Sequence, residues 1–309
     1  MDGAARVASI GRMTRDATQP GASGAAAAGE RLRIAVAQTE VGPDPRANGA
    51  EIRLLMRRAA EAGARLIQFT EGAISGCPSG EGKRALAGWR VDWAGLRDEL
   101  EKTAALAAEL QLWTVVGSNH PLTPPNRPHN SLYVISSSGE LVARYDKRLL
   151  SFTEINDWYK PGFEQLIFEV DSFRFGCALC IEIQFPEIFV EYARENVDAV
   201  LLSTFSRDPM FAIQAQGHAA CGGFWIGFSV PAQCSDAAPA GLIGPDGRWI
   251  ARAPSDGSSA LAVADLDRTS PALDVALNHA RAWRARARDG ELYDAARVID
   301  PRSTDRTRF

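Results

Sequence analysis

Long apolar runs and excess charge of one sign are both missing from this sequence of 309 residues. No apolar run approaches the roughly 20 residues that a membrane-spanning helix needs, and the N-terminus lacks the apolar segment of a secretory signal. The net charge of -4 at pH 7 provides no basic surface of the kind that nucleic acid or an anionic membrane requires. We therefore expect a cytoplasmic globular protein that has neither a nucleic-acid nor a membrane partner.

Cysteine and histidine are also scarce. The chain has five cysteines, an odd number that argues against a disulfide scaffold and favours a reducing compartment, where a thiol is available for chemistry. A cysteine–histidine hydrolase is disfavoured, because the histidines form no pattern that pairs with a cysteine. These histidines are His120, His129, His218 and His279.

The composition otherwise fits one globular unit, with 46% hydrophobic and 23% charged residues. Residues 1–29 are rich in Ala, Gly, Ser and Thr and predict a disordered leader. Residues 30–270 predict a single domain. Residues 271–309 predict a C-terminal arm or tail, whose run of arginines is typical of a solvated helix face, with a subunit-contacting arm as the alternative.

Short β-branched and aromatic runs alternate with helical patterns along residues 30–270, which predicts parallel strands joined by helices. A hairpin over residues 130–146 adds antiparallel strands, so the predicted sheet is mixed. No internal repeat is visible. The predicted strands are 33–38, 66–70, 113–118, 130–136, 140–146, 173–179, 199–203, 225–231, 242–243 and 260–265, and the predicted helices are 51–62, 93–110 and one that begins at residue 186.

Glu71, Lys147 and Cys180 each follow directly after a predicted strand. The carboxyl ends of strands in open α/β sheets form the edge where ligands bind, so we expect these side chains to converge. A nearby cation lowers the pKa of a thiol, and a carboxylate can take and return its proton. The Lys147 ammonium and the Ile181 N–H are the predicted donors to an oxyanion. Glu154, in the loop after Lys147, is predicted to hold the lysine.

Four stretches of sequence resemble, in order, the Glu, Lys, second-Glu and Cys motifs of the nitrilase superfamily of carbon–nitrogen hydrolases. They are LIQFTEGAISG, HNSLYVISSSGELVARYDKRLL, TEINDWYKPG and GCALCIEIQFPE. Three flanking segments add support: RIAVAQTE resembles the first strand of that family, GLIGPDGRWIA a late hairpin, and ARARDGELYD a C-terminal segment.

The resemblance implies an αββα sandwich, usually dimerised through the helices that cover its sheets. It also implies a Cys–Glu–Lys mechanism without metal or organic cofactor. Carried onto this chain, it assigns Glu71 as the base, Lys147 as the oxyanion stabiliser, Cys180 as the nucleophile and Glu154 as the supporting carboxylate.

The substrate expected from these motifs is a small linear amide or an N-carbamoyl compound, hydrolysed through a thioester on Cys180 with release of ammonia. Nitrilases proper commonly have Cys-Trp-Glu at the nucleophile, whereas this chain has Cys-Ile-Glu, so nitrile hydrolysis is the less favoured alternative. Transfer of the acyl group to an acceptor other than water is a variant. Residues expected to bind substrate are Glu182, Trp158, Tyr159 and Ile181.

Other interpretations of the same residues remain. A non-catalytic binding or assembly protein on the same fold is one of them. Cys177 and Cys180 form a C-x-x-C, which invites a redox or zinc interpretation, but on one strand their Cα atoms would be roughly 10 Å apart, too far for a disulfide. Zinc would need two further ligands. Cys77 is a rival nucleophile, although it lacks the strand–turn–helix setting of Cys180.

Overall fold

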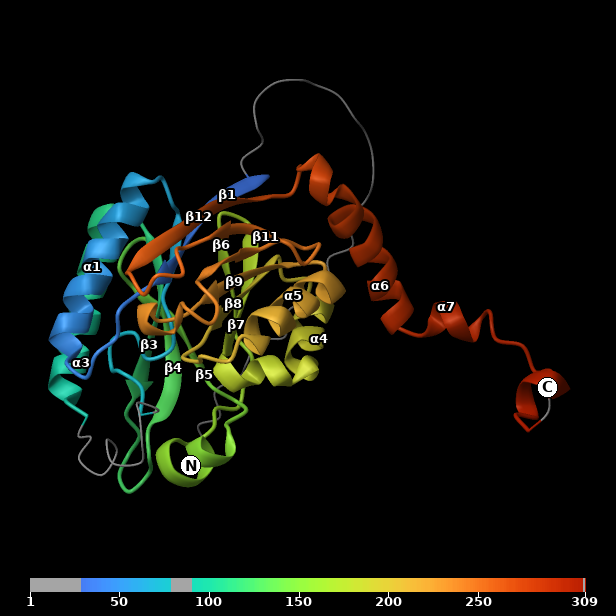
Figure 1. The fold of residues 1–309 in the computed structure, drawn as a ribbon, viewed down its shortest axis with the longest axis horizontal. Coiled ribbons are helices and arrows are strands. Elements are labelled where there is room, and N and C mark those ends of the chain that lie inside the picture. Colours follow the sequence, from blue (N-terminus) through green and yellow to red (C-terminus); the bar gives the residue numbers. More distant parts are fainter. Residues whose placement is uncertain (1–28, 79–90, 308) are drawn as a thin grey trace, which may run out of the picture.

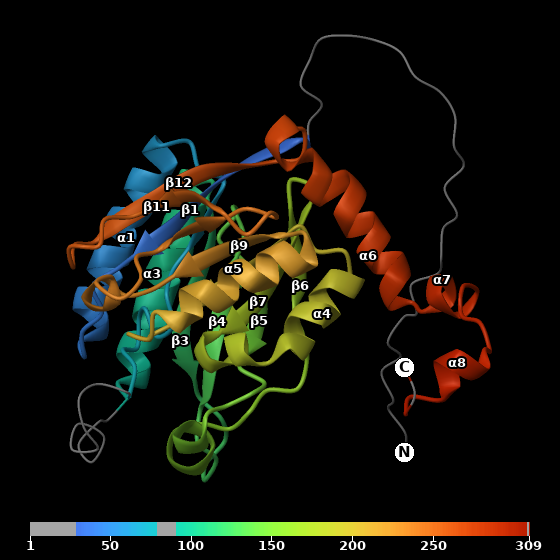
Figure 2. The same ribbon diagram turned by 45° about the vertical axis from the view of Figure 1, so that its right-hand side comes forward.

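The computed structural model describes residues 29–78, 91–307 and 309, so the predicted leader lies outside the described residues except for residue 29. Two six-stranded sheets face each other. Helices α1 and α3 cover the outer face of one sheet, and α4 and α5 cover the other, as Figures 1 and 2 show. The αββα sandwich implied by the sequence motifs is confirmed.

The first sheet has the strand order β12-β1-β2-β3-β4-β5. Its central strands β1, β2 and β3 are parallel, while β4, β5 and β12 are each antiparallel to the neighbour they pair with. The elements are β1 (Arg31–Gln38), α1 (Pro45–Glu61), β2 (Leu66–Gln68), α3 (Trp93–Leu110), β3 (Trp113–His120), β4 (His129–Ile135), β5 (Leu141–Asp146) and β12 (Ala260–Asp267).

The second sheet, of order β11-β10-β9-β8-β7-β6, repeats this connectivity: three parallel strands alternate with two helices, and two antiparallel strands follow. No repeat was visible in the sequence. Strand β6 was not predicted, and β11 falls in the hairpin that the motifs implied. The elements are β6 (Ile167–Val170), β7 (Phe173–Leu179), α4 (Pro186–Arg194), β8 (Ala199–Ser203), α5 (Met210–Gly222), β9 (Trp225–Ser229), β10 (Gly241–Ile243) and β11 (Trp249–Arg252).

Local sequence signals explain where the helices of the first sheet begin. Asp44 accepts a hydrogen bond from the backbone N–H of Arg46, and Pro45 occupies the first position of α1, where a missing N–H costs nothing. Asp92 caps α3 in the same way. Both helices then bury an apolar stripe against the sheet. A separate core fills the space between the sheets, with Val36, Leu66, Val115, Val134, Phe175 and Leu179 among its members.

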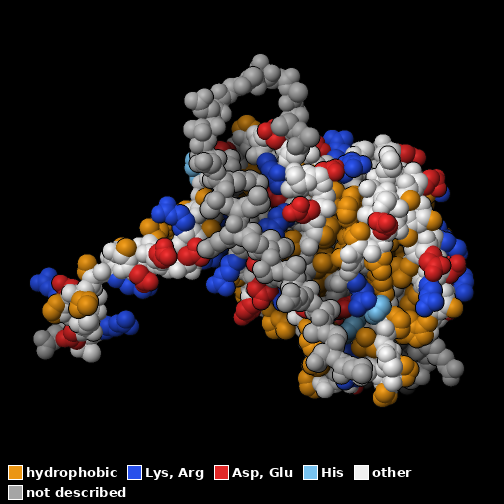
Figure 3. Space-filling view, turned by 180° about the vertical axis from the view of Figure 1, so that it is seen from behind, with side chains coloured by type: hydrophobic (Ala, Val, Ile, Leu, Met, Phe, Trp, Pro, Cys, Tyr) orange, Lys and Arg blue, Asp and Glu red, His pale blue; other side chains and the backbone are white. Residues whose placement is uncertain are grey.

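Beyond β12 the chain leaves the body as an arm with α6 (Arg281–Arg288), α7 (Glu291–Asp294) and α8 (Pro301–Thr304). The arm extends away from the sheets and carries side chains of both charges (Figures 1 and 3). Three of its arginines also contact the body: Arg281, Arg284 and Arg288 donate to backbone carbonyls just before β8 and in the last turn of α5. They attach α6 to the body. No helix of the described residues is long and apolar enough to cross a membrane.

Candidate active site

Several side-chain hydrogen bonds join the sheets near the ends of β2 and β8. The Thr70 hydroxyl donates to the Thr204 carbonyl at 2.6 Å, and the Ser203 hydroxyl donates to the Phe69 carbonyl at 2.7 Å. The end of β2 therefore lies against the end of β8. This contact places Glu71, which follows Thr70, beside residues of the second sheet.

Glu71 and Lys147 meet at this edge, as their positions after strands predicted. The Lys147 ammonium donates to Glu71 Oε1 at 3.1 Å and to Glu154 Oε1 at 2.6 Å. The lysine side chain has no exposed area, and the two carboxylates are nearly as buried. Glu154 lies in a single π-helical turn, Glu154–Trp158, where the Ser151 N–H also binds its carboxylate. Lys147 is thus enclosed between two acids.

Two further donors orient Glu71, and the sequence analysis found neither. Asn130 Nδ2 donates to Oε1 at 2.7 Å, and the backbone N–H of Phe205 donates to Oε2 at 2.9 Å. Asn130 stands opposite Lys147 at the end of β4, where the Lys147 N–H donates to its carbonyl. Its amide could have been suspected from the motif HNSLYVIS, in which Asn130 opens the strand that leads to the lysine.

Electrostatic interactions determine the protonation states of Lys147 and Glu154. Burial alone would lower the pKa of Lys147, but Glu71 and Glu154 raise it well above its ordinary value. Burial acts in the opposite sense on Glu154, where Lys147 and the bonds from Ser151 bring the pKa below its ordinary value. Lys147 is therefore an ammonium and Glu154 a carboxylate at neutral pH.

Cys180 occupies the turn directly after β7, with φ of 49° in the left-handed region that L-residues rarely adopt. Its thiol lies within the electrostatic reach of Glu71, Lys147 and Glu154. Lys147 acts to lower the pKa of this thiol, as predicted, but the net shift of the pKa is upward. Burial, followed by Glu71, raises the pKa more than Lys147 and Thr204 lower it. A raised pKa favours the neutral thiol, so Cys180 would need a base to take its proton if it acted as a nucleophile.

Thr204 is a candidate site residue that the sequence analysis missed. Leu179 pairs with Ser203 in the register of β7 and β8, so Cys180 and Thr204 leave the sheet side by side. Thr204 is fully buried, and its hydroxyl has no hydrogen bond of ordinary geometry within the described part of the chain. Its influence on the Cys180 pKa shows that it faces the thiol. The signal was present, since Thr204 directly follows an apolar strand, as Cys180 does.

The residues expected to bind substrate divide into two groups. Tyr159 is buried, and burial followed by the charges of Cys77, Glu71 and Glu154 raises its pKa, which places its ring beside the site. Ile181 and Trp158 are partly exposed. Ile181 is the second residue of the short 3-10 turn Cys180–Gln184, where the first N–H groups have no partner within the turn.

Glu182 requires a correction, because its carboxylate is fully buried and serves the framework. The Tyr145 hydroxyl donates to both of its oxygens, at 2.9 and 2.8 Å. The backbone N–H groups of Arg148, Leu149 and Leu179 supply three more bonds. Glu182 therefore ties the turn after Cys180 to the segment after Lys147 and has no oxygen to offer a substrate.

The structure also shows where the two cysteines of the C-x-x-C lie and whether metal-binding side chains gather near one another. Cys177 is buried in the core between the sheets, and all five cysteines, which lie within the described residues, are outside disulfides. The described part of the chain contains no group of three or more His, Cys, Asp or Glu side chains that could hold a metal ion. The geometry thus assembles a thiol, an acid and the amine of Lys147.

Comparison with known proteins agrees with this geometry. The family described as carbon-nitrogen hydrolase matches residues 33–272. The chain belongs to this family. The resemblance to the nitrilase superfamily is thereby confirmed, and the protein is placed among hydrolases of carbon–nitrogen bonds.

Relatives of this carbon–nitrogen hydrolase include two Mycobacterium tuberculosis proteins, one from strain CDC 1551 and one from strain H37Rv, each named a hydrolase. Each is 29% identical to this chain in an alignment 275 residues long, and the match covers 79% of this chain and 92% of the relative.

Solved structures with the same fold include an amidase of the nitrilase superfamily from Nesterenkonia. One cysteine-to-alanine mutant of it has a TM-score of 0.69 at 20% identity, covering 87% of this chain and 98% of that chain. A second form, described as carrying the acetamide moiety of fluoroacetamide on its active-site cysteine, has a TM-score of 0.70 with the same identity and coverage. At this identity the likeness shows a shared fold.

Proposed function

We propose that this protein hydrolyses a small linear amide or an N-carbamoyl compound through a thioester on Cys180, with release of ammonia. The observation that carries the proposal is the buried Lys147 ammonium, held between Glu71 and Glu154 beside a thiol. Burying one ammonium and two carboxylates costs desolvation energy that a structural role would not need. Perturbed groups of this kind cluster at catalytic sites.

The first half of the reaction forms the thioester. Glu71 accepts the proton of the Cys180 thiol as the sulfur attacks the carbonyl carbon, and the carbonyl π electrons move onto oxygen. The Lys147 ammonium and the Ile181 N–H stabilise the resulting oxyanion. When the oxyanion collapses, the C–N bond breaks and Glu71 returns its proton to the leaving nitrogen, so ammonia departs and the acyl group stays on sulfur.

The second half releases the acid. Glu71 takes a proton from a water molecule, whose oxygen attacks the thioester carbonyl and forms a second oxyanion at the same donors. Collapse breaks the C–S bond, and the proton on Glu71 restores the Cys180 thiol. One carboxylate thus serves every proton transfer, which fits the three donors that hold Glu71 in a single orientation. No step calls for a metal or an organic cofactor.

The preference for small amides draws on the fold relatives. The Nesterenkonia amidase is described in complex with butyramide and with the acetamide moiety of fluoroacetamide on its cysteine. Both are short aliphatic amides. An amide also presents a carbonyl oxygen, which suits the proposed donors Lys147 and Ile181, whereas a nitrile presents a nitrogen.

Ammonia release tests this proposal. Butyramide, an N-carbamoyl amino acid and butyronitrile would be offered to the parent, to Cys180→Ala and to Cys221→Ala, which changes an exposed cysteine. We expect turnover of an amide or carbamoyl compound by the parent and by Cys221→Ala only. Turnover by Cys180→Ala at the parent rate would refute the nucleophile. Absence of turnover on the whole panel would favour a non-catalytic binding protein.

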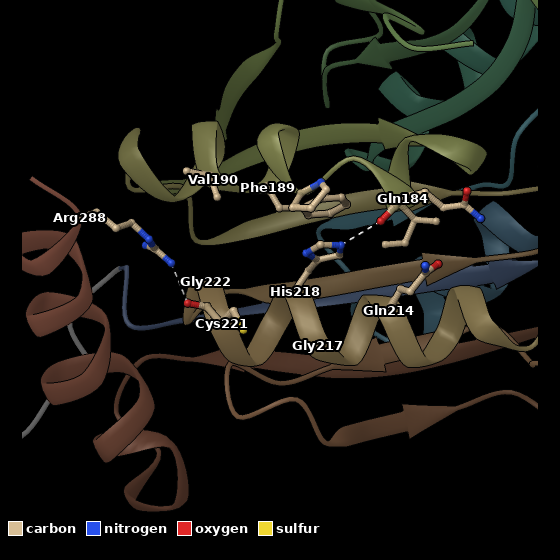
Figure 4. Close-up of a pocket in the computed structure, with 11 residues that line it drawn as sticks. Gln184, Phe189, Val190, Gln214, Gly217, His218, Cys221, Gly222 and Arg288 are labelled. Carbon is tan, nitrogen blue, oxygen red and sulfur yellow. Dashed lines mark hydrogen bonds between the residues drawn. The ribbon is translucent and has the colours of Figure 1, made fainter. Parts of the chain in front are cut away.

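We further propose a homodimer joined through α4 and α5. Met210 and Ile213 on α5 are 49% and 56% exposed, an apolar surface on helices that cover a sheet. A cavity of about 420 Å³ lies between the two helices. Figure 4 shows the His218 ring from α5 beside the Phe189 ring from α4, and the two rings are stacked. His218 Nε2 lies 2.9 Å from the Ile183 carbonyl oxygen. The odd number of cysteines, five, favours a reducing, cytoplasmic setting for this dimer.

A further inference from the structure

A second cavity, of about 320 Å³, lies on the outer face of the first sheet beneath α3. Strand β4 alternates its side chains between the two faces of the sheet. Asn130 points inward to Glu71, whereas Tyr133 belongs to the outer core and lines this cavity. The sheet therefore separates the cavity from the catalytic thiol. Apolar walls come from Trp93, Leu96, Leu100, Ile135 and Leu141.

A chain of hydrogen bonds runs along the outer face of the sheet and ends in this cavity. Arg144 donates to Asp146 at 2.7 and 2.9 Å and to His120 Nε2 at 2.8 Å. Because a guanidinium can only donate, Nε2 of His120 must carry the lone pair. The other ring nitrogen, Nδ1, lies 2.7 Å from the Tyr133 hydroxyl. Burial and the charge of Arg144 lower the pKa of His120, which agrees with a neutral ring.

The tautomer of His120 determines whether the Tyr133 hydroxyl donates or accepts the hydrogen bond between the two side chains. A neutral imidazole with its lone pair on Nε2 has its proton on Nδ1, so Tyr133 is the acceptor of that bond. The hydroxyl keeps its own proton, because burial raises the pKa of Tyr133 to about 12. No second bond of this hydroxyl is found within residues 29–78 and 91–307. A buried donor, on a side chain only 6% exposed, is therefore left for an acceptor in the cavity.

We propose that this cavity binds a small uncharged molecule with an apolar body and one carbonyl oxygen, which accepts the Tyr133 hydrogen bond. The charges around the site are balanced: Arg144 is paired with Asp146, and the lining includes Arg97 and Glu101 of opposite sign. A neutral acceptor suits a neutral hydroxyl in such surroundings. The cavity volume lies in the range of ordinary ligand sites, and its walls are largely apolar, as in such sites.

Acetophenone is the probe that tests this site, and α-methylstyrene is its control, since it replaces the carbonyl oxygen by a methylene of similar shape. A ketone has no C–N bond, so it is no substrate of the proposed hydrolase. Titration by ligand-observed NMR should show binding of both to the parent, with acetophenone the tighter. Tyr133→Phe, which keeps the ring, should weaken acetophenone about threefold to tenfold and leave α-methylstyrene unchanged.

Two further samples locate the binding. Protein alkylated on Cys180 with iodoacetamide should bind acetophenone as the parent does, because the sheet lies between the two sites. Leu100→Trp, which fills the cavity, should lose both ligands while its circular dichroism stays that of the parent. The proposal is overturned if acetophenone does not bind the parent, if Tyr133→Phe leaves its affinity unchanged, or if alkylation abolishes binding.

Discussion

The hydroxyl of Thr204 faces the thiol of Cys180 at the ends of two paired strands. A thiolate accepts a hydrogen bond better than a thiol does, so we expect this hydroxyl to stabilise sulfur as Glu71 removes its proton. Thr204→Val keeps the shape of the side chain and removes the hydroxyl donor. It should lower kcat/KM about tenfold, which corresponds to the free energy of a hydrogen bond to a charged group. The rate of Cys180 alkylation by iodoacetamide should fall with it.

Thr204→Ser is the matched control, because it retains the hydroxyl. It should keep both rates near those of the parent. If the valine and serine variants behave alike, Thr204 fills space beside the thiol and does not assist it.

Glu154 is expected to contribute to stability in a manner that depends on pH. Its pKa in the folded protein lies below the ordinary value of 4.5, so the folded state binds this proton less tightly than the unfolded state does. The contribution is therefore fully present above about pH 4.5 and is lost as the pH falls through the lowered pKa. Glu154→Gln should cost about 2 kcal/mol of unfolding free energy at pH 7.

Urea denaturation of the parent and of Glu154→Gln at pH 7, 5 and 4 would measure this difference. The gap between the two proteins should shrink as the pH falls. A gap that stays constant or grows toward pH 4 would mean that the charge of Glu154 does not stabilise the fold.

The sequence predicted which residues come together in the site, but it did not predict their burial or their hydrogen-bond partners. Glu71, Lys147 and Cys180 were found because each ends a strand, and the structure brings them together. The direction of the Cys180 pKa was missed because burial, which dominates it, depends on residues distant in sequence. Glu182 was misassigned for the same reason, since its donor Tyr145 lies on another strand.

At the scale of elements, the close approach of β2 and β3 holds Glu71 in place. Gly117 on β3 lies under the chain that leaves β2, where a Cβ atom would overlap the Thr70 carbonyl and come within 3.0 Å of the Glu71 Cα. Gly117→Ala should therefore displace Glu71, the proposed base. A shift of about 1 Å at a catalytic group costs on the order of a hundredfold in kcat, which steady-state ammonia release would measure.

Gly42→Ala is the control for this element. A Cβ atom there would meet only the Asn48 side chain, at 3.7 Å, an ordinary contact. The variant should retain the activity of the parent. If Gly117→Ala were folded and equally active, the position of Glu71 would not depend on this contact.

Helices and strands with a clear apolar pattern of their own were predicted from the sequence. A strand that forms only by pairing with its neighbour was not. Residues 93–110, 173–179 and 199–203 match α3, β7 and β8 in full, because each has a clear apolar pattern. Strand β6 is a four-residue edge strand that pairs only with β7, and so short a run has little periodicity of its own. The contacts of the α6 arginines with the body were not predicted, because the carbonyls they bind belong to distant elements.

At the scale of the whole molecule, two sheets of the same connectivity pack together, and the candidate site lies where strands of both sheets end. The proposed dimer uses the helices α4 and α5, which cover the outer face of the second sheet. Ile213→Glu puts a charge into the exposed surface of α5 and should yield a monomer at concentrations where the parent is a dimer, as measured by light scattering after size exclusion. Leu54→Glu, on α1 and 52% exposed, should remain dimeric.

A monomeric parent would contradict the dimer, and a dimeric Ile213→Glu would place its interface elsewhere. Neither result would affect the catalytic assignment, since every residue of the assembled site comes from one chain.

The central claim, a covalent acyl group on Cys180, is tested most directly by intact mass spectrometry of the protein quenched in acid during turnover of an amide. We predict an adduct with the mass of the acyl group, located on the peptide that contains Cys180, in the parent and in Cys221→Ala but not in Cys180→Ala. An adduct on a different residue, such as Cys77, or the same adduct in Cys180→Ala, would contradict the account.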